Sequence, residues 1–178
     1  MKPIATTLLT LLLLAPSTAF SQTRNRSTSR QKPTTSTAAA TQKLAQVRTQ
    51  GATRVADQIK FLTRFIYLLG GVTSGIAAVD EAERRKEASQ AVIQQNQQSK
   101  AQVRTSIQGF RESLDRLEID FRATPELQPY YIKLAGVAAG AATAEEQAAA
   151  NQFDRSGRSL LGVINRLTDV LLLMRTTE

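Results

Sequence analysis

The stretch FIYLLGGVTSGIAAV, residues 65–79, decides the fold, because it is either a membrane span or the corner between two helices. It has no charged residue between Arg64 and Asp80. In a helix it extends about 22 Å, whereas the hydrocarbon core of a bilayer is about 30 Å thick. Glycines and hydroxyl residues lower its hydropathy further. We therefore predict a corner at Gly70-Gly71, where glycine is a natural helix end.

The first 21 residues have the pattern of a cleaved export signal. Lys2 is followed by an apolar stretch from Ile4 to Ala15 and then by small residues up to Ser21. This apolar stretch is shorter than the roughly 20 residues that a membrane span needs, so cleavage after Ser21 is expected. The protein is thus predicted to be exported, either to the periplasm or out of the cell.

The net charge of +8 is confined to one part of the chain. Residues 24–64 hold nine basic residues and one acid, whereas residues 80–178 hold thirteen basic and fourteen acidic residues. Residues 22–37 are rich in Ser, Thr and Arg and have no large apolar side chain. Such a segment cannot bury enough surface to offset its ordering entropy, so we predict a disordered basic linker.

This basic arm is the candidate site for a polyanion, which could be a lipid headgroup, lipopolysaccharide, a cell-wall polymer or DNA. Export argues against nucleic acid, and the alternative is that the arm is only a solvated linker. The candidate polyanion-binding residues are Arg24, Arg26, Arg30, Lys32 and Lys43.

Residues 38–178 are predicted to form one helical domain. The apolar residues of 38–69 fall on one arc of a helix, with basic residues opposite. After the corner, Thr73 or Ser74 could cap a long second helix that ends near Arg122. Its apolar residues alternate at spacings of four and three, which indicates helix-on-helix packing. This seam comprises Val103, Ile107, Phe110, Leu114, Leu117 and Phe121.

Two further helices are predicted. Thr124-Pro125 is typical of a helix start, and a short third helix should become regular at about Tyr130. The capping-box spacing from Thr143 to Glu146 predicts the start of the last helix. That helix carries a second seam with the same alternation, comprising Phe153, Leu160, Ile164, Leu167, Leu171 and Met174, with Gly157 at one position.

These elements predict an all-α antiparallel bundle of about four helices, with a short third helix and a long second one, behind a signal peptide and a disordered basic arm. Stability must come from packing, because the chain has no cysteine and therefore no disulfide. The apolar faces of the first and last helices are compatible with a homodimer.

The composition argues against an enzyme. The chain has neither histidine nor cysteine, which excludes the common nucleophile–base pairs and ordinary zinc sites. Carboxylate pairs such as Asp115 and Glu118, or Asp80 and Glu83, have basic neighbours on a helix face, which favours a structural role. We predict no catalytic residue, metal or cofactor.

The predicted function is a binding or scaffolding module in the cell envelope or outside the cell, with an unknown protein or an envelope polyanion as partner. The alternatives are a holdase-like periplasmic chaperone and a membrane-active protein that inserts a hairpin around residues 61–79, with peripheral membrane contact. The heptads and capping signals are generic to helical bundles and identify no family.

Overall fold

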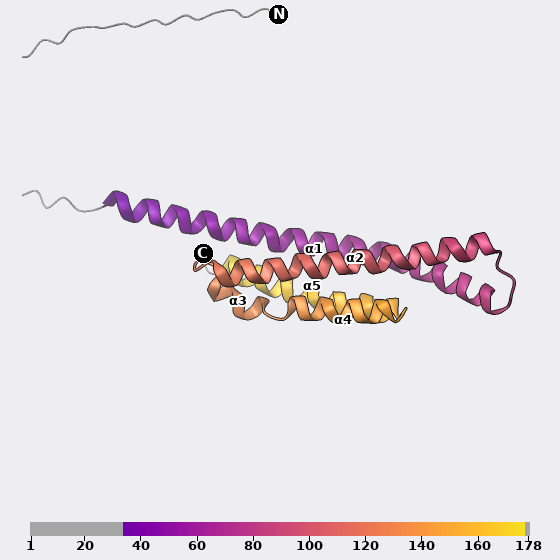
Figure 1. Ribbon diagram of the computed structural model, residues 1–178. Helices are drawn as coiled ribbons and strands as arrows, with labels where there is room; N and C mark the ends of the chain where they lie inside the picture. Colours follow the sequence, from indigo (N-terminus) through magenta and orange to yellow (C-terminus); the bar gives the residue numbers. More distant parts are fainter. Residues whose placement is uncertain (1–33, 177–178) are drawn as a thin grey trace, which may run out of the picture. The chain divides into compact units, whose positions relative to one another are not determined.

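The computed structural model describes residues 34–176, with side chains from residue 38, and these residues form the predicted all-α bundle. Within this range there is no strand. The predicted signal peptide and the basic linker as far as residue 33 lie outside the described residues. The five helices are α1 (Thr34–Arg84), α2 (Gln90–Ala123), α3 (Gln128–Leu134), α4 (Val137–Ala149) and α5 (Phe153–Thr176) (Figure 1).

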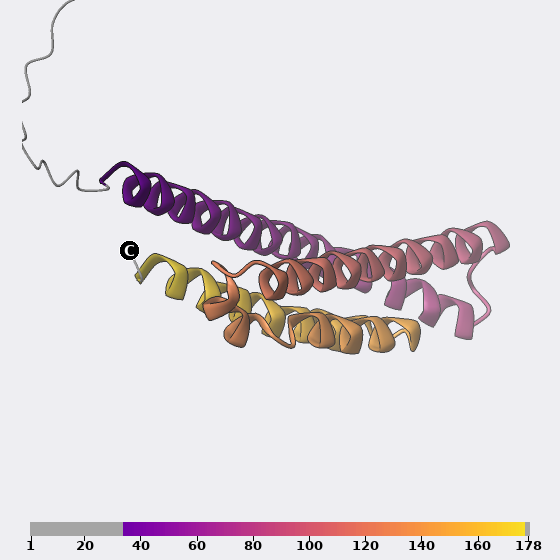
Figure 2. The same ribbon diagram turned by 60° about the vertical axis from the view of Figure 1, so that its left-hand side comes forward.

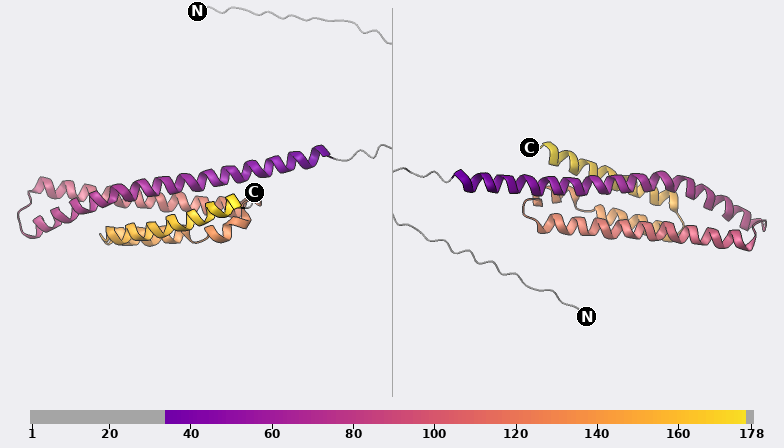
Figure 3. Two further views of the ribbon diagram at one scale, coloured as in Figure 1. Left: turned by 180° about the vertical axis from the view of Figure 1, so that it is seen from behind. Right: turned by 90° about the horizontal axis from the view of Figure 1, so that it is seen from above.

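Four of these helices form an antiparallel bundle. α1 packs against α2 and α5, and α4 packs against the same two helices, so α1 and α4 lie at opposite corners. The short α3 lies against α2 and α5 (Figure 2). Both α1 and α2 are longer than α4 and continue past the α4–α5 turn as a two-helix hairpin (Figure 3). We call residues 77–102 of this hairpin the arm; this arm is separate from the predicted basic linker at residues 22–37.

The core runs along the inner side of α1, α2, α4 and α5. On α1, four buried side chains recur every seven residues, at Val55, Leu62, Leu69 and Ile76. α4 buries mainly alanine, which lets it approach α5 closely. A Cβ on Gly140 would lie 2.8 Å from Val163 Cγ2 of α5. We call the four α1 residues the inner seam.

The predicted corner at Gly70-Gly71 is wrong, because α1 continues through residues 65–79 without a break. The hydroxyls of Thr73 and Ser74 do not cap a helix; both donate to the carbonyl of Gly70 within α1. A glycine in a helix interior costs about 1 kcal/mol, whereas burial of a Leu or Ile side chain contributes about 1.5–3 kcal/mol. Leu69 and Ile76 are both buried, so packing on either side of the glycines outweighs their cost.

The chain turns instead at residues 85–89. The N–H of Glu87 donates to the Ala82 carbonyl and that of Lys86 to the Glu83 carbonyl, which together close the end of α1. Lys86 adopts φ 63°, a conformation that glycine usually supplies at this position. Ser89 then caps α2 by accepting the N–H of Val92. The first helix is therefore the longest, and the second is shorter than predicted.

The helix boundaries after α2 also differ from the prediction. Thr124 is the C-cap of α2 rather than the start of the next helix. The predicted third helix is divided at Gly136, whose φ of 93° ends α3 and begins α4. Thr143 lies inside α4, where its hydroxyl donates to the Ala139 carbonyl, so the predicted capping box does not open the last helix. α5 begins ten residues later, at Phe153.

Candidate functional site: the outer face of α1

A second apolar seam lies on α1 beside the inner seam, and the bundle leaves most of it uncovered. Its residues alternate at spacings of four and three, and we call them the outer seam: Phe61, Phe65, Leu68, Val72, Gly75 and Val79. Three of its large side chains are substantially exposed, with Phe61 at 59%, Leu68 at 55% and Val72 at 40%. An alternating apolar seam of this length is what a helix uses to pack against another helix.

The outer seam borders a groove between α1 and α2. Two cavities of about 310 and 320 Å³ lie in this groove, and Val72 and Ser99 line both. The ring of Phe65 meets that of Phe110 edge to face, with 5.1 Å between the ring centroids. On the α2 side the groove is lined chiefly by uncharged residues, namely Val92, Gln95, Asn96, Ser99, Gln102, Val103 and Ser106.

The surface around the outer seam has no charged residue over a long distance. α1 is uncharged from residue 65 to 79, and α2 is uncharged from 90 to 99. On other sides of the same uncharged stretch, Tyr67 is 84% exposed, and Cβ atoms placed on Gly70 or Gly71 would meet nothing within 4 Å. Solvated helix faces usually carry many charges, and depletion of charge is typical of the centre of an interface.

A polar cluster holds α1 and α2 together in the arm. Asp80 Oδ1 accepts a hydrogen bond of 2.6 Å from Asn96 Nδ2 and one of 2.7 Å from Lys100 Nζ. Asn96 and Lys100 are both buried, so each satisfies its polar group on the same carboxylate. One buried polar contact among apolar layers fixes the register of paired helices. This cluster therefore aligns the two walls of the groove.

Two further carboxylates, Glu118 and Glu145, have partners within the fold. Glu118 Oε1 accepts from the N–H groups of Gly136 and Ala138, at 3.0 and 2.8 Å, and so caps α4. Glu145 pairs with Arg111 at 2.6 Å between α4 and α2. Within residues 34–176 there is no group of three or more side chains suited to a metal ion.

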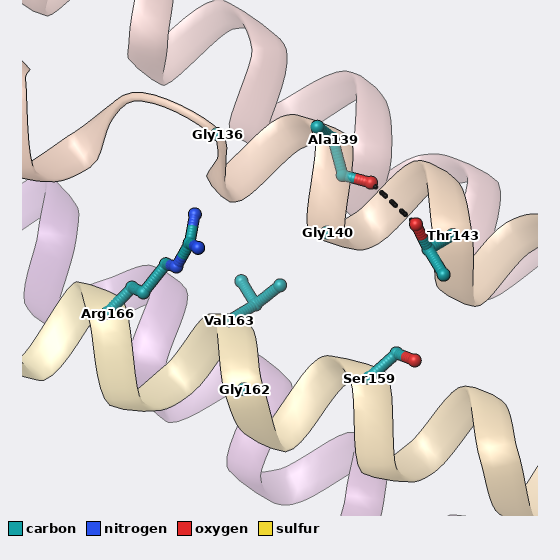
Figure 4. A pocket seen from close by; sticks show the side chains of 8 residues that line it. All are labelled: Gly136, Ala139, Gly140, Thr143, Ser159, Gly162, Val163 and Arg166. Atoms are coloured by element: carbon teal, nitrogen blue, oxygen red, sulfur yellow. Dashed lines mark hydrogen bonds between the residues drawn. The ribbon is translucent and has the colours of Figure 1, made fainter.

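A further cavity, of about 400 Å³, lies between α4 and α5 (Figure 4). Small residues line most of it, and Arg166 is the one charged residue among those that do. Thr143 donates to the Ala139 carbonyl, and Ser159 donates to Gln147 Oε1 at 2.9 Å, so both hydroxyls are engaged. The residues that line this cavity therefore offer no nucleophile with a base beside it.

The residues predicted from sequence fall into three groups. Arg24, Arg26, Arg30 and Lys32 lie outside the described residues, and Lys43 is exposed on the first turns of α1. Of the twelve apolar seam residues on α2 and α5, nine are buried, while Phe110, Ile164 and Leu171 are partly buried. The outer seam was missed, because a single apolar face was predicted for the first helix. The spacing of Phe61, Leu68 and Val72 was the available signal.

Comparison with known proteins adds no further guide to this site: no protein-family model, curated protein or solved structure matches the chain. Among the described residues, α1 is long and apolar enough to cross a membrane by length and composition. Its most apolar window of 18 residues has a mean hydropathy of 1.4, and 17% of that window is buried. Core helices of soluble proteins and signal sequences meet the same criterion, so the value alone is weak evidence.

Proposed function

We propose that the protein is an exported, non-enzymatic binding module that holds a helical partner on the outer seam of α1. The observation that carries this proposal is the outer seam, in which Phe61, Leu68 and Val72 are exposed and along which α1 is uncharged from residue 65 to 79. Large apolar side chains gathered on one face of a soluble domain mark an interaction site, whereas scattered ones do not.

The shape of the surface favours a helix as the partner. The groove between α1 and α2 runs along both helices, and its apolar positions recur at helical spacing. A helix laid into such a groove buries one face against alternating anchors. The anchors would be Phe61, Leu68 and Val72, and the amide and hydroxyl groups of α2 would bond polar groups at the edge of the contact.

The remaining chemistry supports a role in binding. The chain has no histidine or cysteine, and Asp80, Glu118 and Glu145 are engaged in caps and ion pairs within the fold. The cavity between α4 and α5 likewise uses its two hydroxyls internally.

A pull-down from the native envelope fraction tests the proposal. Leu68→Lys places a charge in the outer seam, and Leu172→Lys places one on the exposed side of α5, where Leu172 is 54% exposed. A partner should be retained by the unaltered protein and by Leu172→Lys, and lost with Leu68→Lys. A partner that survives Leu68→Lys would place recognition elsewhere on the chain.

Membrane insertion is the second candidate, and the apolar window of α1 is the observation in its favour. Against it, Leu62, Leu69 and Ile76 are buried in the bundle, and insertion would require α1 to leave α5. Vesicle flotation distinguishes the two. Binding to neutral and anionic vesicles that Leu68→Lys abolishes would support insertion. Absence of binding at low salt would exclude insertion and favour the protein partner.

A further inference from the structure

We propose that the occupant of the outer seam is a second copy of this chain, packed antiparallel with seam against seam. This inference rests on the proposed function, since it names the partner of the same surface. The two hairpins would stack so that α1 meets α1 and α2 meets α2, and the two grooves would face each other. Both partners contribute the same patch, as a two-fold interface requires.

The spacing of the outer seam is the first support. The intervals along it are four, three, four, three and four residues, which is the same sequence in both directions about residue 70. An antiparallel second copy therefore matches every position of the seam with another position of the seam. The matched pairs are Phe61 with Val79, Phe65 with Gly75, and Leu68 with Val72.

The sizes of the side chains select the antiparallel orientation. The large residues Phe61, Phe65 and Leu68 form one half of the seam, and the smaller residues form the other. In the antiparallel arrangement each large residue meets a smaller one, which keeps the distance between the helices even. In a parallel arrangement Phe61 would meet Phe61 and Gly75 would meet Gly75, leaving a bulge at one end and a void at the other. A Cβ on Gly75 would meet nothing within 4 Å, so the space that Phe65 of a second copy needs is open.

The charges also suit a second copy. A surface that packs against itself brings like charges together wherever it is charged, and α1 is uncharged from 65 to 79, on both sides of residue 70. Gln95, Ser99 and Gln102 line the α2 side of the groove. Amide and hydroxyl groups both donate and accept hydrogen bonds, so these side chains can bond polar groups of a second copy.

A bilayer fits the same surface less well than a second copy does. The apolar seam covers only one wall of the groove, and the α2 wall is lined mainly by amides and hydroxyls that lipid tails cannot hydrogen-bond. A second copy buries the apolar wall and satisfies the polar wall together.

Sedimentation equilibrium of the purified protein tests the second copy. We expect a dimer at micromolar concentration, a rise of roughly tenfold or more in its dissociation constant for Leu68→Lys, and no change for Leu172→Lys. Circular dichroism should show the same helix content and unfolding midpoint for both variants. A monomer up to about 100 μM, or a dimer unaffected by Leu68→Lys, overturns the proposal.

Cross-linking tests the orientation, because the chain has no cysteine and any introduced thiol is the only one. Phe61→Cys and Val79→Cys would be oxidised separately and as a mixture. The antiparallel arrangement gives cross-linked dimers in the mixture and few in either variant alone, since the two Phe61→Cys thiols would lie about 27 Å apart along the helix. Efficient cross-linking of Phe61→Cys to itself would show a parallel pair and overturn this arrangement.

The outcomes separate this inference from the proposed function. A monomer that still loses an envelope partner with Leu68→Lys overturns the second copy and retains the binding module. A monomer that loses no partner with Leu68→Lys overturns both. A monomer that floats with vesicles in a Leu68-dependent manner assigns the surface to a membrane.

Discussion

The inner and outer seams of α1 differ in what covers them, although both are apolar and only a short arc apart on one helix. The inner seam is buried by α2 and α5, and Leu62 is fully buried. The outer seam lies along the edge of the contact between α1 and α2. Its residue Leu68, six residues after Leu62, is 55% exposed. Both seams have regular spacing. The inner one supports the fold, and we propose that the outer one contacts another molecule.

The largest expected effect tests the difference between the two seams directly. Leu62→Ala should lower the free energy of unfolding by about 2–5 kcal/mol, because it leaves a cavity in a packed core. Leu68→Ala should lower that of the monomer by less than about 1 kcal/mol, because the side chain already faces water. Urea denaturation at protein concentrations too low for self-association would measure both losses. Equal losses would show that the outer seam is part of the core.

The second prediction concerns the end of the inner seam, where Asp80 follows Ile76. Asp80→Ala should destabilise the arm by about 3 kcal/mol, because it leaves the buried Lys100 ammonium without its ion pair. Hydrogen exchange should accelerate within residues 77–102 and remain slow near Leu114.

A double variant separates burial of charge from loss of packing. Asp80→Asn combined with Lys100→Leu should recover most of the stability, because it removes both charges together and leaves the buried Asn96 amide an acceptor. Protection that is lost to the same extent in the double variant would mean that the polar pair itself, and not the stranded charge, holds the arm.

The sequence predicted the parts of the fold that depend on local periodicity. The apolar spacing of α2 and α5 placed residues such as Ile107, Leu114 and Leu160 where the structure buries them. The corner at Gly70-Gly71 failed because helix continuity there depends on burial of Leu69 and Ile76 by other helices, which no local signal encodes. The true turn was missed because Lys86 adopts a left-handed conformation in which glycine is the usual residue, so the sequence has no glycine there to indicate the turn.

The third prediction concerns Phe65, which lies where the outer seam meets α2. A double-mutant cycle of Phe65→Leu and Phe110→Leu should give a coupling free energy of about 0.5–1.5 kcal/mol, which is the range for edge-to-face aromatic pairs. Thermal unfolding of the two single variants and the double variant would supply the values. Additive effects would show that the rings do not hold the wall of the groove in place.

The smallest expected effect concerns Gly75 in the outer seam. One substitution there should stabilise the monomer and weaken the dimer. Gly75→Ala should raise the free energy of unfolding of the monomer by about 0.5–1 kcal/mol, since alanine favours helix and the added Cβ meets nothing. Gly162→Ala, at an equally open position in α5, is the matched control and should give a similar gain. Self-association should weaken for Gly75→Ala alone, because the added methyl group occupies the space that Phe65 of a second copy needs. If both variants associate as the unaltered protein does, Gly75 lies outside the contact, and the pairing about residue 70 is incorrect.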